Sequence, residues 1–421
     1  MILTLRVGVR QLRRAAGIRE LQVGFGILLF GGGVVAAFLL AFPQLTPSTA
    51  LQLVTTFVAA VAGVYLSHTL VVHRIFKTDR DRIDAPEAVC ERYADAVELL
   101  ELSGLESLNP AYAGELPLVV HDSDVFEGPD PSFPTERSDS VYQLPASVSA
   151  FLEPRRDDLV ARFNSEGKHN RRLVRVDAIR GSTVRVSESS YFRTYCTNIS
   201  PDFTGRSDRK SLRDAFDPEL VTERGIVPLS ESPFSNTLSG GGLVVTTDGA
   251  TILGLKALDA TVGERELADS FGGNVEFQRF GDASVRDELV REATEEVASV
   301  TERDVRVLYG LGLVRRLDWL GQPNLHSLLL VDAPAELVHS GTEHLHTISV
   351  DLGEDVTVDE ASLSDPDFAR EFVSEILDAC ESSRYTPGVT LLTTLELWLR
   401  QAGATKERLQ PDRSRTPEKR K

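Results

Sequence analysis

Two long runs of mostly apolar residues, uncharged apart from His68, stand near the start of the chain at 21–42 and 51–72. At about 1.5 Å rise per residue, a helix over either run covers a bilayer core roughly 30 Å thick. The connection 43–50 has no Lys or Arg, whereas basic residues flank the pair: Arg6, Arg10, Arg13, Arg14 and Arg19 before it, and Arg74, Lys77, Arg80 and Arg82 after it. Because basic residues favour the cytoplasmic side, the pattern predicts a transmembrane hairpin over 1–80 in the cell membrane, with both termini and the soluble remainder cytoplasmic.

The hairpin has two open questions. A cleaved signal peptide would have an apolar region of only about 7 to 15 residues, followed by an A-x-A-like site that is missing here. Small residues at Gly24, Gly26, Gly31–Gly33, Ala59 and Gly63 allow close packing, either within one hairpin or between chains, so a homo-oligomer formed through the spans stays open. No charged residue lies in mid-span, which favours an anchor over a transport pathway.

Residues 84–235 predict a linker helix followed by an α+β extension. Apolar positions at helical spacing predict a helix over 84–102 that stops before Gly104. The Pro-rich run 114–137 contains a short predicted strand at 116–120. The part after this strand is predicted to be a surface loop or a flexible segment. Alternation on both sides of Arg180-Gly181 predicts a hairpin with strands at 173–178 and 183–187, and a short helix or turn follows.

Residues 238–402 have the pattern of a sheet with flanking helices. Strands are predicted at 243–246 and 251–255 around an Asp248-Gly249 turn, and at 305–313, 326–332 and 347–351. Helices are predicted at 284–298, 367–380 and 387–401, the last capped by Thr386, opened by Pro387 and closed by Gly403. The tail 406–421 is polar and is expected to be disordered.

Composition narrows the function classes. The formal net charge of -18 disfavours general nucleic-acid binding, because phosphate backbones would be repelled. The basic residues are mostly Arg, and such an acidic, Lys-poor chain is typical of proteins that stay soluble at high salt. The three cysteines, Cys90, Cys196 and Cys380, are isolated, so neither a disulfide framework nor a zinc site is indicated.

The sharpest chemical feature is Gly272-Gly273-Asn274-Val275-Glu276, followed by a helix-forming segment from Ser284. On that helix Glu292, Glu295 and Glu296 are related by i, i+3 and i+4, so three carboxylates share one face. Like charges so placed repel, and a hard divalent cation with oxygen ligands would relieve the repulsion. The plainer interpretation of such a cluster is a solvated acidic face.

The order of these parts resembles the Nudix hydrolase family, whose signature contains REUxEExGU with U aliphatic. Residues 291–296 (REATEE) match its core position by position if Ala is accepted at U. The resemblance covers roughly 238–399 and implies an α/β/α sandwich with a mixed sheet. It implies metal-assisted attack of water on a nucleoside diphosphate linked to another group, with Mg²⁺ or Mn²⁺ held by the catalytic Glu292, Glu295 and Glu296.

The resemblance also assigns supporting residues. Arg291 would brace the preceding loop by a salt bridge, and Gly272 and Gly273 would shape the turn before the helix; these glycines, with Glu276 and Arg279, are candidate substrate-binding residues. Three departures stand against the match. Arg279 occupies the place of an expected Glu, the loop 277–282 has the length of an insertion with Asp282 as a substitute acid, and Ala298 stands where the family has Gly.

Two other functions remain open. The same pocket could recognise a nucleotide without turning it over and signal to the hairpin, since the order of parts resembles membrane effectors of nucleotide-signalled antiviral defence. The soluble part could also be a protein-binding scaffold. Weaker candidates are His339, His344 and His346, which lack regular metal-ligand spacing, and Ser239 to Gly242 (SGGG), which lacks the Lys of a P-loop.

Overall fold

The computed structural model describes residues 86–405 apart from gaps at 123–125, 132–133, 166–167, 205–209, 257–265, 278–283, 298–299, 335–343, 354–355 and 384. Contacts divide the chain into two units, residues 1–83 and 84–421. The predicted spans 21–42 and 51–72 lie outside the described residues, and so does the tail 406–421. Among the helices that are described, none has the length and apolar character needed to cross a bilayer.

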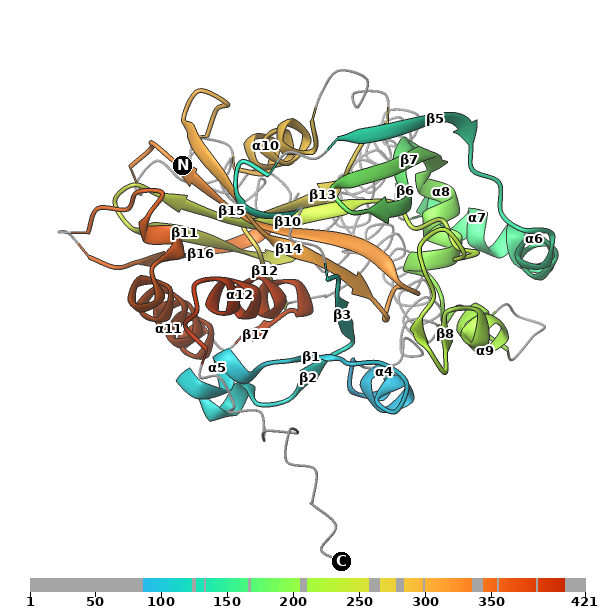
Figure 1. Ribbon diagram of the computed structural model, residues 1–421, viewed down its shortest axis with the longest axis horizontal. Helices are drawn as coiled ribbons and strands as arrows, with labels where there is room; N and C mark the ends of the chain where they lie inside the picture. Colours follow the sequence, from blue (N-terminus) through green and yellow to red (C-terminus); the bar gives the residue numbers. More distant parts are fainter. Residues whose placement is uncertain are drawn as a thin grey trace, which may run out of the picture. The chain divides into compact units, whose positions relative to one another are not determined.

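A mixed sheet forms the centre of the second unit (Figure 1). Its order is β17-β12-β11-β10-β15-β14-β3, with β13 also paired to β10, β16 to β11 and β4 to β14. The pairs β10–β15 and β12–β17 are parallel, and the other pairs in this sheet are antiparallel. The strands are β3 (Leu118–Val120), β4 (Glu127–Pro129), β10 (Ser239–Thr246), β11 (Ala250–Lys256), β12 (Glu266–Ala268), β13 (Phe271–Asn274), β14 (Val305–Arg316), β15 (Gln322–Val331), β16 (His344–Asp351) and β17 (Thr386–Pro387).

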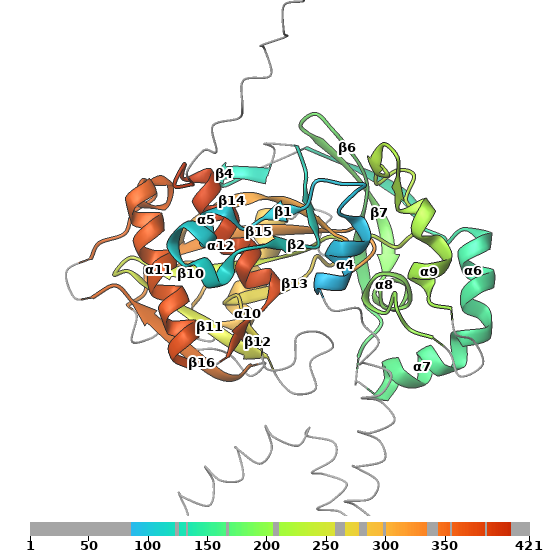
Figure 2. The same ribbon diagram turned by 90° about the horizontal axis from the view of Figure 1, so that it is seen from below.

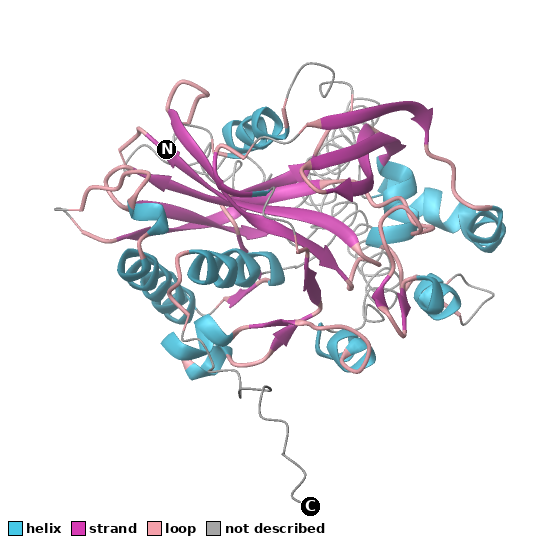
Figure 3. Cartoon of the chain, in the orientation of Figure 1, coloured by secondary structure: helices cyan, strands magenta, loops and turns pink. Residues whose placement is uncertain are grey.

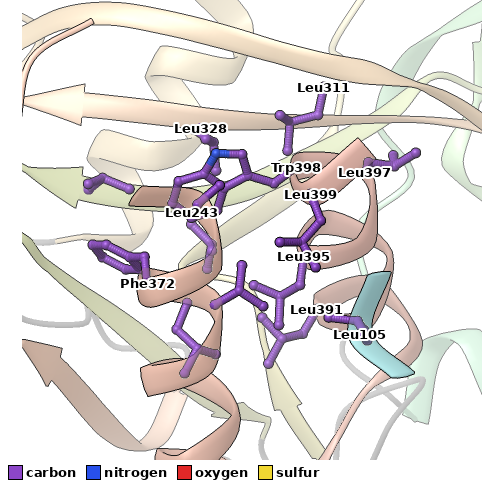
Figure 4. Close-up of a cluster of buried hydrophobic side chains, with 14 of the residues drawn as sticks. Leu105, Leu243, Leu311, Leu328, Phe372, Leu391, Leu395, Leu397, Trp398 and Leu399 are labelled. Atoms are coloured by element: carbon purple, nitrogen blue, oxygen red, sulfur yellow. The ribbon is translucent and has the colours of Figure 1, made fainter. Parts of the chain in front are cut away.

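Helices cover both faces of this sheet, which gives the predicted α/β/α sandwich (Figure 3). The helix α10 (Val285–Glu296) packs on one face, in a core with Val244, Leu325 and Leu329. The helices α11 (Pro366–Ser383) and α12 (Val389–Gln401) pack on the other face, around the buried Trp398 (Figure 4). A short helix, η7 (Ser362–Ser364), precedes α11, and Leu363 accepts a hydrogen bond from the Trp398 indole.

The extension begins with a group of short elements that lie together in Figure 2. They are α4 (Pro86–Tyr93), β1 (Leu100–Glu101), α5 (Ser103–Leu108), η1 (Pro110–Tyr112) and β2 (Glu115–Leu116). On α12, the fully buried Glu396 accepts hydrogen bonds from the backbone N–H groups of Gly104 and Leu105, at 3.2 and 3.0 Å. Since β3 and β4 both pair with β14, the extension also supplies strands to the main sheet.

The rest of the extension carries a three-stranded sheet in the order β5-β7-β6. The hairpin predicted there is confirmed by β6 and β7, which pair antiparallel on either side of Gly181. The other elements are β5 (Thr135–Val141), α6 (Ala146–Leu152), η3 (Glu153–Arg155), α7 (Arg156–Ser165), β6 (Arg172–Arg180), β7 (Thr183–Ser190), α8 (Tyr191–Thr194), the π-helical turn η4 (Tyr195–Ile199), α9 (Leu212–Phe216), η5 (Asp217–Glu219), β8 (Val221–Thr222) and β9 (Gly225–Ile226).

The surface loop predicted within 114–137 is wrong, because strand β4 lies in this segment and β5 begins in it. Two predicted helix boundaries are also wrong. The helix expected over 84–102 ends at Tyr93, because Leu100 is taken by the β1–β2 pair, where it lies opposite Leu116. The last helix begins at Val389 with Gly388 as its N-cap rather than Thr386, since Pro387 belongs to β17 and pairs with Leu267. In both places a tertiary strand pairing overrides the local helix signal.

Candidate functional site

Two glycine-rich strands lie side by side at the site that the motif predicts. Gly240 of β10 is paired with Gly273 of β13, and Gly241 with Gly272. The turn predicted at Gly272 and Gly273 is therefore wrong, because both residues belong to an antiparallel strand pair. A Cβ on Gly241 would lie 2.6 Å from the Phe271 carbonyl oxygen, so the close approach of these two backbones requires glycine.

The helix α10 lies close to this glycine surface. It begins with a capping box, in which Ser284 and Asp287 exchange side-chain and backbone hydrogen bonds. Leu289 faces the sheet, where a Cβ on Gly240 would come within 2.5 Å of its Cδ2 atom. Glycine at that position thus allows the helix to approach the strand, and it fixes which residues of α10 meet β13.

Two of the three predicted carboxylates meet β13. The Gly272 N–H donates a hydrogen bond to Glu296 Oε2 at 3.0 Å. The carboxylate of Glu292 lies against Gly273, where a Cβ would be 2.4 Å from Oε2. The Glu295 side chain is 53% exposed and is directed away from the core. The structure therefore joins the glycines and two glutamates of the motif, with the third glutamate at the surface.

Arg291 is the cation of this cluster. Its guanidinium forms ion pairs with Glu288 at 3.2 Å, with Glu292, and with Glu295 at 2.7 Å. The predicted role for Arg291 was to brace the loop before the helix, whereas its partners in the structure belong to its own helix. The guanidinium neutralises carboxylates that would otherwise repel each other along α10.

Electrostatics differ among the residues of the cluster. Burial raises the pKa of Glu292; Arg291 opposes this shift, and the charges of Glu295 and Glu288 add to it. Burial acts to lower the pKa of Arg291, but hydrogen bonding to Glu295 and the charges of Glu292 and Glu288 outweigh it, so the net shift is upward. The site thus holds a firmly protonated guanidinium beside a carboxylate that binds a proton more readily than usual.

The oxygen donors of these glutamates suit a divalent cation, but their arrangement in the structure does not form a metal site. The glutamates supply hard oxygen atoms, and Arg291 stands in the cluster as a bound cation. Within the described ranges, however, no three His, Cys, Asp or Glu side chains are grouped so that they could hold a metal ion. A metal held by Glu292, Glu295 and Glu296 would therefore have to displace Arg291 from Glu292 and Glu295.

The remaining candidate residues from the sequence lie partly in the extension contact, partly in strand β16 and partly outside the described residues. Glu276 forms a 2.6 Å ion pair with Arg171, next to a bridge between its own backbone and Leu173 of β6. Arg279, Asp282, Ala298 and His339 lie outside the described residues. His344 and His346 belong to β16, where they pair with β11.

One group beside the motif escaped the sequence reasoning. The guanidinium carbons of Arg137 and Arg172 lie 4.2 and 5.6 Å from the ring centre of Phe277, so the extension brings positive charge to the segment that follows β13. The Arg171-Arg172 pair at the start of β6 was the signal in the sequence, and it did not indicate which surface these side chains would meet.

No protein-family model and no curated protein matches the sequence. The solved structures that it resembles include several Nudix hydrolases. A bifunctional NMN adenylyltransferase/ADP ribose pyrophosphatase from Francisella tularensis is 18% identical over 28% of this chain and 35% of that chain, with a TM-score of 0.22. A Nudix hydrolase from M. smegmatis is 14% identical over 35% and 87% of the two chains, with a TM-score of 0.21. A MutT protein from Methanosarcina mazei is 20% identical over 34% of this chain and 92% of that chain, with a TM-score of 0.20.

About a third of the Francisella chain is spanned by its match. TM-scores of this size do not define the fold of the present chain. Its mixed α/β character follows from the strand order and the helices on both faces of the sheet.

Proposed function

We propose that the chain binds and hydrolyses a nucleoside diphosphate linked to another group, as a Nudix-like hydrolase. The observation that supports this most is the contact between α10 and β13, in which Glu296 accepts a hydrogen bond from Gly272 and Glu292 lies against Gly273. In a merely solvated acidic face the carboxylates would point to water, whereas here a Cβ on Gly273 would meet the Glu292 carboxylate, so this glutamate is packed against the glycine strand.

The chain's own residues divide the work in this proposal. Burial raises the pKa of Glu292, so without a bound metal this carboxylate takes up a proton more readily than an exposed glutamate does. Glu295, which is exposed, faces the approaching substrate, and Glu296 is held in place by the Gly272 N–H. A bound Mg²⁺ or Mn²⁺ held by these three glutamates would supply neutralisation of charge on the phosphoryl oxygens.

The experiment is a panel of nucleoside diphosphate derivatives incubated with residues 84–421 and Mg²⁺ or Mn²⁺. Glu295→Gln and Glu296→Gln are each expected to lower kcat by about a hundredfold or more, as removal of a preorganised electrostatic contact commonly does. Glu371→Gln on α11 is the matched control, because this exposed glutamate lies on a helix of the opposite sheet face. Turnover that survives both site substitutions would contradict the proposal.

A second candidate function is nucleotide sensing without turnover. The observation that favours it is the closed cluster around Arg291, whose ion pairs with Glu292 and Glu295 occupy the carboxylates that catalysis requires. Calorimetric binding of the same panel distinguishes the two functions, since a sensor binds a nucleotide that it leaves intact. If the wild type neither binds nor cleaves any of these compounds, the glutamates form only an acidic face.

The sequence pattern of the first 80 residues supports a further proposal, that the hairpin holds this domain at the cytoplasmic face of the membrane. Basic residues precede the first predicted span and follow the second, whereas the connection between the spans has none, which favours both termini in the cytoplasm. A tag at the C-terminus is therefore expected to be shielded from protease in sealed cells and cleaved in inverted vesicles. Cleavage in sealed cells would overturn this topology and, with it, access to cytosolic nucleotides.

A further inference from the structure

Arg315 on β14 is a buried arginine whose charge is not balanced by a neighbouring acid. The residue is 3% exposed, and within the part of the chain that the structure describes it forms no ion pair. Three other buried arginines each pair with an aspartate, Arg175 with Asp177, Arg213 with Asp202 and Arg316 with Asp318. Since an unpaired buried charge is unfavourable, Arg315 calls for an anion that the described residues do not provide.

The hydrogen bonds of Arg315 leave one nitrogen unused. Nε donates to the Gly321 carbonyl at 3.0 Å, and Nη1 donates to the Val227 carbonyl at 2.5 Å. Nη2 is buried and has no hydrogen-bond partner among the described residues. A Cβ on Gly321 would lie 2.7 Å from Nη2, so glycine at this position makes room for the guanidinium itself.

A second buried donor lies nearby, on His121. Its backbone N–H donates to the Leu313 carbonyl at 2.9 Å, which continues the β3–β14 pairing, where Val119 is opposite Arg315. Because side chains alternate along strands, His121 and Arg315 project from the same face. His121 Nδ1 is also buried without a partner in the described ranges, while the residue as a whole is partly exposed.

The charges around His121 point to the same ligand class. Burial lowers the pKa of His121, and the positive charge of Arg315 lowers it further, against the opposing effect of Asp122. Burial also lowers the pKa of Arg315, to about 9, which leaves its guanidinium charged at neutral pH. The protonated guanidinium and the nearby imidazole form a region of positive potential. Each has one nitrogen without a partner among the described residues, and the tautomer with the proton on Nδ1 makes both nitrogens donors.

We propose that Arg315 and His121 form a binding site for a small inorganic oxyanion of the phosphate type. The guanidinium Nη2 and the imidazole Nδ1 donate hydrogen bonds to two oxygens of the ion, and the ion supplies the countercharge that Arg315 lacks. Guanidinium and imidazole donors suit such oxyanions, because a hydrogen bond to an ionised acceptor is stronger than one between two neutral groups. His121 provides the route from solvent, since it is the partly exposed member of the pair.

The proposed oxyanion site is separate from the glutamate cluster, and a bound ion there would affect stability rather than catalysis. Arg315 lies on β14, while the glycines of the cluster lie on β13, with β10 and β15 between them in the sheet. The residues that surround the proposed ion come from both the extension, at His121 and Val227, and the sheet, at Arg315 and Gly321. A bound oxyanion would therefore hold the extension to the sheet and stabilise their junction.

The test is equilibrium dialysis of the full-length protein with labelled inorganic phosphate in a buffer of low chloride. One phosphate per chain is expected to bind, and Arg315→Met and His121→Ala are each expected to weaken binding by about tenfold or more, because each removes a hydrogen bond to a charged group. The melting temperature of the wild type is expected to rise with phosphate concentration, as linkage requires for a ligand of the folded state.

Three control variants separate this site from others. His169→Ala removes an exposed histidine of the extension and is expected to leave phosphate binding unchanged. Glu296→Gln is likewise expected to leave it unchanged, so phosphate bound at the glutamate cluster would be recognised. Arg315→Met removes an unbalanced charge and is expected to fold; if it does not, His121→Ala, at a partly exposed position, decides the matter alone. Absence of phosphate binding, or binding that survives both site substitutions, would overturn the proposal and leave water as the partner of both nitrogens.

Discussion

Gly242→Ala is expected to destabilise the domain strongly, whereas Gly272→Ala, in the neighbouring strand, is expected to be tolerated. A Cβ on Gly242 would lie 1.7 Å from the backbone carbonyl oxygen of Ser327, its partner in the parallel β10–β15 pair. Backbone cannot move aside as a side chain can, so the strands must separate. We expect a loss of about 3 kcal/mol or more in the free energy of unfolding, at the upper end of overpacking effects.

Gly272 is the matched control, because a Cβ there would meet nothing closer than the Gly240 carbonyl oxygen at 3.7 Å. Alanine at this position is expected to change the free energy of unfolding by less than about 1 kcal/mol. Chemical denaturation of residues 84–421, followed by circular dichroism, measures both variants. Equal stability of the two proteins would show that the β10–β15 contact is looser than the structure indicates.

Arg213→Met is expected to destabilise the domain by about 3 to 5 kcal/mol, the cost of breaking a buried ion pair from one side. The Arg213 side chain is fully buried and binds both carboxylate oxygens of Asp202, at 2.7 and 3.0 Å. It also donates to the carbonyls of Leu317 and Asp318, each at 2.7 Å. Methionine would leave the Asp202 charge buried without its partner and would release the β14–β15 turn.

The double variant Arg213→Met with Asp202→Leu separates these effects. Removing both charges takes away the desolvation penalty, so the double variant is expected to be more stable than Arg213→Met alone. Denaturation midpoints of the two single variants and the double variant give the coupling energy. A coupling energy near zero would contradict the assignment of Asp202 as the partner whose charge determines the loss.

The sequence predicted those elements whose pattern is complete within the element itself. The helix that starts at Ser284 and the alternation along β6 and β7 are local signals, and each is confirmed. Gly403, predicted to end the last helix, has a φ of +67°, which glycine adopts without strain. The closed cluster around Arg291 could not be predicted, because spacing along a helix does not say which partner a guanidinium selects.

The failures occurred where a distant strand decides the conformation. Gly272 and Gly273 have low strand propensity, and only their pairing with Gly240 and Gly241 places them in a sheet. Pro387 resembles a helix start until β12 is known to lie beside it. The role of Arg315 was equally hidden, since an arginine in an apolar segment does not reveal whether an acid will face it in the fold.

The pairing of β3 and β4 with β14 bears on how this chain could have diversified. An excised sheet would present the backbone groups of β14 unpaired, and such an exposed strand invites association with other chains. The segment between the predicted hairpin and the glutamate helix is therefore not an exchangeable spacer. If this sheet were fused to a different membrane anchor, residues 118–129 would have to be retained, or another segment would have to pair with β14 in their place.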